Sequence, residues 1–218
     1  MSGITHDYIE KYIRSLIKES GKELLEMEEY AKENHVPIIH KEVGQFIELF
    51  INIVKPLRIL ELGTAIGYSS ILMSRSAGTA AKITTIERDE KMVELALENI
   101  KKSGLDKNIE VLEGDCLEIL GILSEKYDII FMDAGKGHYK DFLPHCIRLM
   151  DKNGVIISDN VLFRGMIASD ELVDKRKSTI VKRMREYLEC ISDSEEFITS
   201  VIPMGDGIAV TARRNVNE

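Results

Sequence analysis

The stretch RILELGTAIGYS, residues 58–69, reads as an apolar strand that runs directly into a glycine-containing loop. Gly63 and Gly67 let a ligand approach the backbone there, and the helix expected after the loop begins with unpaired N–H groups. The spacing is not the GxGxxG of dinucleotide sites, which disfavours a nucleotide-dependent dehydrogenase, and no Gly-Lys-Ser/Thr of a P-loop follows. A plain strand-to-helix turn is the alternative, but it needs no acid at Glu61. The stretch therefore predicts a ligand-binding turn.

Short apolar runs and helical patterns alternate downstream of this stretch. The runs cover residues 58–62, 82–87, 109–113, 127–133 and 155–159, with helical patterns such as residues 90–103 between them. Such alternation predicts an α/β fold, with a parallel sheet and helices on both faces. The last two runs, residues 197–202 and 208–212, flank the turn sequence Pro203-Met-Gly-Asp-Gly207. They predict an antiparallel hairpin that closes one edge of the sheet.

The first 55 residues show helical periodicity. Thr5 is a candidate cap for a first helix, and later patterns end at Val36-Pro37 and before Pro56. We therefore expect one domain over residues 1–218, with a helical extension over 1–55 and an α/β core over 56–218.

Composition narrows the class of protein further. The chain has 218 residues, of which 44% are hydrophobic and 30% charged, as in globular proteins with one substantial core. Neither a signal peptide nor a membrane-spanning stretch is visible. Cys116, Cys146 and Cys190 are widely spaced and odd in number, which is typical of reduced thiols. We therefore expect a cytoplasmic protein without a membrane partner, and the net charge of −8 argues against a general nucleic-acid coat.

Two acids at strand ends suit a nucleoside-containing ligand, because ligands of open α/β sheets bind beyond the carboxyl ends of the strands. Glu87 ends the second run, where a carboxylate can accept hydrogen bonds from both hydroxyls of a ribose. A solvated strand-end acid is its alternative. Asp115 follows the third run, and it can accept from an adenine amino group, cap the next helix, or do both.

Three oxygen-bearing side chains follow the next two runs. Asp133 ends the fourth run, and Asp159 and Asn160 end the fifth. Unpaired carboxylates are costly to bury together, and Asp and Asn oxygens suit Mg²⁺ or Ca²⁺ better than zinc. Solvated loop acids are the alternative. Lys136 lies three residues past Asp133, near enough to serve as a base, although it could also be a surface lysine.

These residues give the chain a resemblance to the metal-dependent, catechol-type S-adenosylmethionine O-methyltransferases, which include the catechol and caffeoyl-CoA enzymes. The resemblance covers nearly the whole chain. It rests on five segments in order, residues 36–39, 61–69, 133–136, 158–161 and 203–208. It implies a Rossmann-like class I methyltransferase fold with a mostly parallel seven-stranded sheet, and it implies a homodimer.

The resemblance also assigns roles to residues. Asp133, Asp159 and Asn160 would hold Mg²⁺ or Mn²⁺, and Lys136 would be catalytic. Their presence argues against a catalytically silent binding module. The implied contacts to S-adenosylmethionine are Val36, Glu61, Gly63, Ser69, Glu87, Asp115 and Asp133.

Within the family the chain most resembles the bacterial transfer-RNA 5-hydroxyuridine methyltransferases, which make 5-methoxyuridine at the wobble position. Residues 175–185 read KRKSTIVKRMR, with six basic residues and no acid, and such a run can hold the phosphates of an anticodon region. A solvated helix face explains it equally well. Both a 5-hydroxyuridine and a small catechol carry the vicinal oxygen pair that a metal could grip, so the substrate stays open. The candidate substrate contacts are Arg164, Lys175, Arg176 and Lys177.

Overall fold

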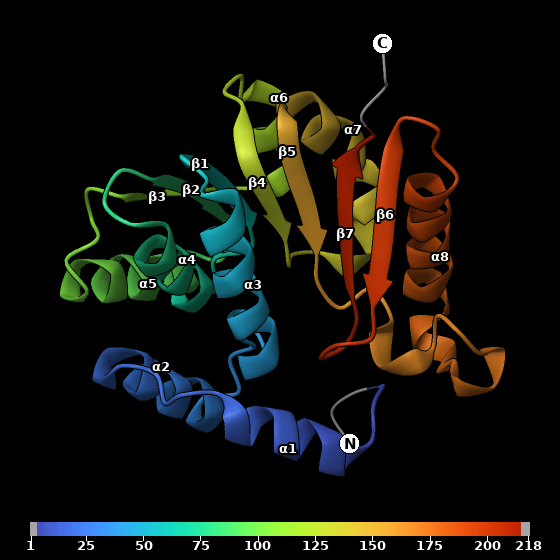
Figure 1. Cartoon of the computed structure of the whole chain (residues 1–218), viewed down its shortest axis with the longest axis horizontal. Helices are drawn as coiled ribbons and strands as arrows, with labels where there is room; N and C mark the ends of the chain where they lie inside the picture. Colours follow the sequence, from blue (N-terminus) through green and yellow to red (C-terminus); the bar gives the residue numbers. More distant parts are fainter. Residues whose placement is uncertain (1–3, 215–218) are drawn as a thin grey trace.

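The computed structural model describes residues 4–214, and seven strands within them form one sheet (Figure 1). The strand order is β3-β2-β1-β4-β5-β7-β6. Strands β1 to β5 run parallel, whereas β7 pairs antiparallel with both β5 and β6, as predicted. The strands are β1 (Arg58–Leu62), β2 (Lys82–Glu87), β3 (Ile109–Glu113), β4 (Tyr127–Met132), β5 (Met150–Ser158), β6 (Phe197–Ile202) and β7 (Ile208–Arg213).

Helices cover both faces of the sheet, because the central strands are apolar at consecutive positions. Ile59 of β1 packs into a core shared with α2 to α5, and the next residue, Leu60, packs into a core shared with α6 to α8. The first group comprises α2 (Lys22–Glu33), α3 (Lys41–Val54), α4 (Tyr68–Ala77) and α5 (Glu90–Lys102), and the second comprises α6 (Cys116–Ile122), α7 (Tyr139–Leu149) and α8 (Ser178–Ser192).

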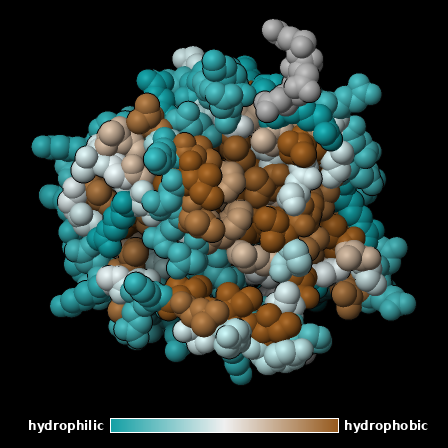
Figure 2. Space-filling model, viewed as in Figure 1, coloured by the Kyte–Doolittle hydropathy of each residue, from teal (hydrophilic) through white to brown (hydrophobic). Residues whose placement is uncertain are grey.

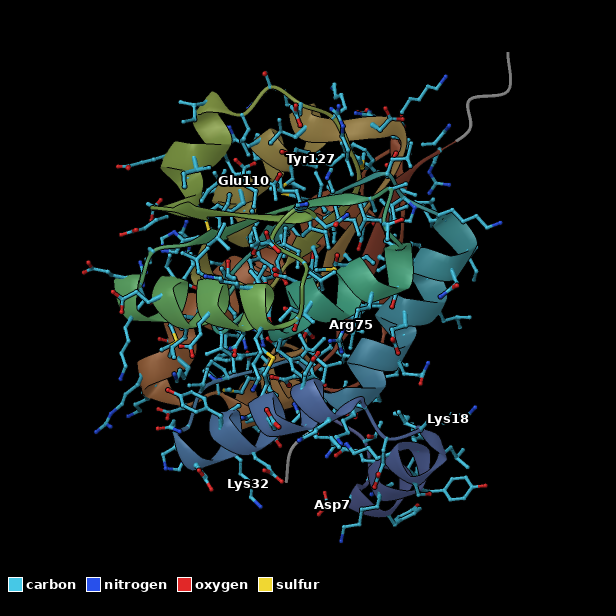
Figure 3. All side chains as sticks on the ribbon, turned by 90° about the vertical axis from the view of Figure 1, so that its left-hand side faces the viewer. Asp7, Lys18, Lys32, Arg75, Glu110 and Tyr127 are labelled. Atoms are coloured by element: carbon cyan, nitrogen blue, oxygen red, sulfur yellow. The ribbon has the colours of Figure 1, made fainter. Side chains whose placement is uncertain are left out.

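The N-terminal extension consists of α1, α2 and α3. Helix α1 (Asp7–Leu16) stands out from the body of the molecule, with Asp7 and Lys18 labelled near its two ends (Figure 3). The prediction that Thr5 caps it is wrong, because the helix begins after His6 and the Thr5 hydroxyl donates instead to Glu10, at 3.2 Å.

Strands β4, β5 and β7 differ from the sequence prediction at one or both ends. Strands β4 and β5 end at Met132 and Ser158, so Asp133 and Asp159 are the first residues beyond them. Strand β5 also begins at Met150 rather than at residue 155. Gly154 lies within this strand. A Cβ there would stand 2.8 Å from the Tyr127 carbonyl oxygen of the neighbouring strand β4, so only glycine fits at this position.

Three short 3-10 helices connect β5 to α8. They are η2 (Phe163–Gly165), η3 (Asp170–Leu172) and η4 (Lys175–Lys177). Among residues 4–214 no helix is long and apolar enough to cross a membrane. Cys116, Cys146 and Cys190 are free thiols.

Candidate active site

A cavity of about 660 Å³ lies at the carboxyl ends of the parallel strands. Because those ends share one edge of the sheet, residues far apart in sequence line the cavity together. Its wall contains eight of the predicted site residues, Gly63, Glu87, Asp115, Asp133, Lys136, Asp159, Asn160 and Arg164. Its wall does not include the other candidates, Val36, Glu61, Ser69, Lys175, Arg176 and Lys177, all of which the structure describes.

Gly63 is a glycine because two strand-end loops meet at it. Its φ is +99°, and a Cβ there would stand 3.0 Å from the Ala134 Cβ and 3.3 Å from the Ala134 backbone nitrogen. The residue thus lets the β1 loop pack against the loop that carries Asp133. The sequence interpretation credited the glycine with ligand approach alone, so this packing role is an addition.

Glu61 is fully buried beneath the β1 loop. Its Oε2 atom accepts hydrogen bonds from the hydroxyls of Thr85, at 2.6 Å, and of Ser70. Its Oε1 atom has no hydrogen-bond partner among the described residues, and burial raises the pKa of Glu61 to about 6. An unpaired buried carboxylate oxygen is costly, so a donor group of a bound ligand would be favourable there.

The Glu87 carboxylate organises the backbone of the loop. Its Oε2 atom accepts from the Ala65 N–H at 2.9 Å, and its Oε1 atom accepts from the N–H groups of Arg88 and Asp89 at 2.9 and 3.0 Å. A carboxylate offers about four acceptor positions, so three are already filled. The side chain therefore ties β2 to the β1 loop, and it retains little capacity for a ribose diol.

Replacing Glu87 with alanine should weaken the binding of S-adenosylmethionine by about 10- to 100-fold, because the loop N–H groups lose their acceptor and the one acceptor position that would remain for a ribose hydroxyl disappears. Isothermal titration calorimetry measures this. Glu87→Gln keeps one oxygen acceptor and should lose less. An unchanged dissociation constant in Glu87→Ala would reduce the residue to a strand-end acid.

Asp115 caps α6, as one of its two predicted roles requires. Its Oδ1 atom accepts from the Leu117 N–H at 2.8 Å, and the side chain is exposed in the cavity wall. The adenine contact stays a prediction.

Asp133 and Asp159 form a pair of acids, of which Asp133 is half-buried and Asp159 is buried. Burial and the neighbouring Asp159 charge raise the pKa of Asp133 well above its ordinary value. Burial also raises the pKa of Asp159 to about 6, although the Asn160 N–H donates to its Oδ1 atom at 2.6 Å. Asn160 adopts φ +58°, a left-handed conformation that asparagine tolerates well. Two carboxylates and an amide beside one another are a fitting donor set for a hard divalent cation.

This donor set relies on the amide. Within residues 4–214, no group of three His, Cys, Asp or Glu side chains is arranged to hold a metal ion. The candidate metal site therefore consists of the two acids and Asn160. Water or substrate oxygens would provide the remaining ligands of a bound cation.

Lys136 faces this acidic cluster. Gly135 adopts φ +58°, which turns the chain so that η1 (Lys136–His138) begins beside the cavity. The Lys136 charge lowers the pKa values of Asp133, Asp159 and Asp206, which places the ammonium within electrostatic reach of all three. It is thus one of the basic groups that balance the acids of this wall, together with Arg164.

Sequence reasoning missed His40, Arg88 and Asp206, which also line the cavity. Asp206 is 7% exposed, lies in the β6–β7 turn, and accepts a hydrogen bond from the Arg164 N–H. The signal was present, because the turn sequence containing Asp206 is one of the five segments of the family resemblance. His40 had no such signal.

The basic run of residues 175–185 divides into two groups. Lys175, Arg176 and Lys177 are exposed in η4, outside the cavity wall. Arg183 instead pairs with Asp141, and Arg185 pairs with Asp170 at 2.7 Å. The run is therefore not a continuous basic stripe.

Several known proteins resemble this chain in sequence and in fold. The family model described as O-methyltransferase matches residues 14–214. The catechol O-methyltransferase of Niastella koreensis is 30% identical over 176 residues, which cover 78% of this chain and 80% of that protein. The caffeoyl-CoA O-methyltransferase of Medicago sativa is 29% identical, covering 78% and 72%. A Staphylococcus aureus structure, provisionally described as a caffeoyl-CoA O-methyltransferase, is 31% identical, with a TM-score of 0.88 over 95% of this chain and all of that one.

The sheet order and the cavity at its carboxyl edge are those of a Rossmann-like class I methyltransferase. The chain belongs to the O-methyltransferase family and is an S-adenosylmethionine-dependent O-methyltransferase of the caffeoyl-CoA and catechol type.

Proposed function

We propose that this enzyme methylates one hydroxyl of a vicinal oxygen pair on a small catechol-like molecule, with the help of a divalent cation. The observation that carries the proposal is the acid pair Asp133–Asp159 with Asn160, balanced by Lys136 in one wall of the cavity. The relatives named above act on catechol or caffeoyl-CoA by their names, which favours a small molecule over RNA.

The cofactor would occupy the part of the cavity between the β1 loop and the ends of β2 and β3. Its contacts would be Val36, Glu61, Gly63, Ser69, Glu87, Asp115 and Asp133. Gly63 and Ala65 of the β1 loop support this placement, because they line the cavity together with Glu87 and Asp115. The Glu61 network, with Ser70 and Thr85, would then keep the loop in one conformation.

Asp133, Asp159 and Asn160 would hold Mg²⁺ or Mn²⁺. A bound divalent cation supplies chelation of two neighbouring substrate oxygens and a lowered hydroxyl pKa. Holding both reactants in fixed positions then favours direct transfer of the methyl group without a covalent enzyme intermediate. Lys136 would accept the proton that leaves the hydroxyl, which requires its neutral amine form, and Asp133 would be one of the groups that hold the cation.

A 5-hydroxyuridine of transfer RNA is the second candidate substrate. Its 5-hydroxyl and 4-carbonyl oxygens form the same kind of vicinal pair as a catechol. The exposed cluster of Lys175, Arg176 and Lys177 favours this substrate. The chain has a net charge of −8, so a local group of three basic side chains is a specific place where RNA phosphates could bind.

Incubation with labelled S-adenosylmethionine and Mg²⁺ separates the candidates. Catechol and caffeoyl-CoA are offered in one arm, and transfer RNA carrying unmethylated 5-hydroxyuridine in the other. We expect the label to appear in the small molecule. Label in RNA alone would replace the small-molecule proposal with the RNA one.

The double variant Arg176→Ala/Lys177→Ala tests the exposed cluster. If it holds phosphates, the Michaelis constant for RNA should rise and its salt dependence should flatten, since log affinity falls by about 0.7–0.9 per phosphate contact for each decade of salt. Turnover of a catechol should stay unchanged. Lys101→Ala/Lys107→Ala, two exposed lysines elsewhere, is the matched control. Equal RNA kinetics in both double variants would mean that the cluster does not bind RNA and is only a solvated part of the surface.

We also propose that the enzyme is a homodimer. Leu49 and Ile53 of α3 are 58% and 69% exposed, and Ile198 of β6 is 54% exposed. Figure 2 shows hydrophobic side chains gathered over α3 and the neighbouring strands β7 and β6. A large exposed apolar patch is typical of a subunit interface. Light scattering after gel filtration should give twice the chain mass, and Ile53→Glu should give the monomer.

A further inference from the structure

His40 lies on the side of the cavity formed by the N-terminal extension. It directly precedes α3, and its side chain is 30% exposed and lines the same wall as Asp159, Asn160 and Asp206.

Arg14 of α1 fixes which ring nitrogen of His40 carries the proton. The Arg14 Nη2 atom lies 2.9 Å from His40 Nδ1, while Arg14 also donates to both oxygens of the nearly buried Glu42, at 2.7 and 2.8 Å. A guanidinium has no acceptor, so Nδ1 must accept this hydrogen bond. The ring therefore keeps its proton on Nε2, whose N–H is a donor.

The opposite edge of the ring packs against the β6–β7 turn. A Cβ on Gly205 would stand 3.6 Å from His40 Cδ2 and 2.8 Å from the nearest Val43 methyl group. Val43 is the side chain that requires glycine at this position, whereas the His40 ring would be at an ordinary contact distance from that Cβ. Arg14 thus anchors the ring through Nδ1, and the β6–β7 turn lies beside its Cδ2 edge.

We propose that His40 is a specificity residue, whose Nε2–H donates to a neutral carbonyl or hydroxyl oxygen that the substrate carries beyond its vicinal oxygen pair. This inference rests on the proposed function and deepens it, by adding an acceptor to the substrate class. A neutral oxygen is favoured because the acids Asp159 and Asp206 line the same wall as His40 and would repel an anionic group. Arg14 acts through the ring and is a positioning residue.

Two catechols of similar size test the proposal. 3,4-Dihydroxybenzaldehyde carries the extra carbonyl, and 4-methylcatechol does not. In His40→Phe, the Michaelis constant for the aldehyde should rise about three- to tenfold, the effect of one neutral hydrogen bond, while that for 4-methylcatechol changes less than twofold. His40→Gln retains an amide N–H and should recover most of the loss. Arg14→Gln should show the same selective loss, since the ring proton is no longer fixed.

The controls separate failure of this inference from failure of the proposed function. His145→Gln, a half-buried histidine on α7 outside the cavity wall, should leave both substrates unaffected. Circular dichroism and melting temperature identify any variant that does not fold. Equal losses for both catechols in folded His40→Phe would overturn the inference and leave the ring as a support for the Asp159 wall.

Calorimetry covers the case in which the parent enzyme methylates neither catechol. The aldehyde is then titrated into the parent and His40→Phe, with S-adenosylhomocysteine and Mg²⁺ present. Tighter binding to the parent supports the role of His40 even though the proposed reaction has failed. Equal affinity, or no binding to either protein, overturns it.

Discussion

Asp159→Ala is expected to abolish methyl transfer, with a fall in kcat/KM on the order of a thousandfold, while S-adenosylmethionine still binds. The variant removes a charged donor from the proposed cation site, and such a site contributes several kcal/mol of transition-state stabilisation. The cofactor side of the cavity is built from other residues, chiefly the β1 loop and Glu87. Labelled-methyl assays measure the activity, and calorimetry measures the cofactor affinity.

Asp159→Asn is the matched variant, because it removes the charge and keeps the shape of a side chain that is 1% exposed. The Asp159 charge raises the pKa of Asp133, so the two carboxylates repel one another. The metal-free asparagine variant should therefore melt no lower than the parent, despite its loss of activity. Full parental activity in excess chelator, with no carried-over metal, would remove the cation from the proposal.

Lys136→Met should lower kcat by about 10²- to 10⁴-fold, the usual contribution of a general base. The KM for S-adenosylmethionine should change little, since the lysine faces the acidic wall rather than the cofactor loop. Steady-state kinetics with saturating cofactor and a catechol measure both quantities.

Lys136→Arg distinguishes a base from a counter-charge. Arginine keeps the positive charge near Asp133 and Asp159 but does not give up or accept a proton near neutral pH. If Lys136 is the base, the arginine variant should be nearly as slow as the methionine one. Parental rates in Lys136→Arg would mean that the lysine only balances the acids.

The fold could be read from the sequence because its signals are local and repeated. Consecutive apolar residues such as Ile59 and Leu60 indicate a strand buried on both faces, and the structure places them in opposite cores. The order of the strand ends then gave the common location of Asp133 and Asp159. Thr5 was misassigned as a cap because its hydroxyl donates to the Glu10 side chain on α1 instead of accepting from a backbone N–H group.

The sequence by itself determined the class of fold, the strand-end residues that share one cavity, and the family. These follow from periodicity and from the rule that parallel strands present their carboxyl ends at one edge. Only the tertiary structure decided how those groups are used. It showed that Glu87 is largely occupied by backbone N–H groups, that Arg183 and Arg185 are paired, and that Arg14 fixes His40. Hydrogen bonds and ion pairs between distant segments depend on how the folded chain packs, so a local sequence pattern does not predict them.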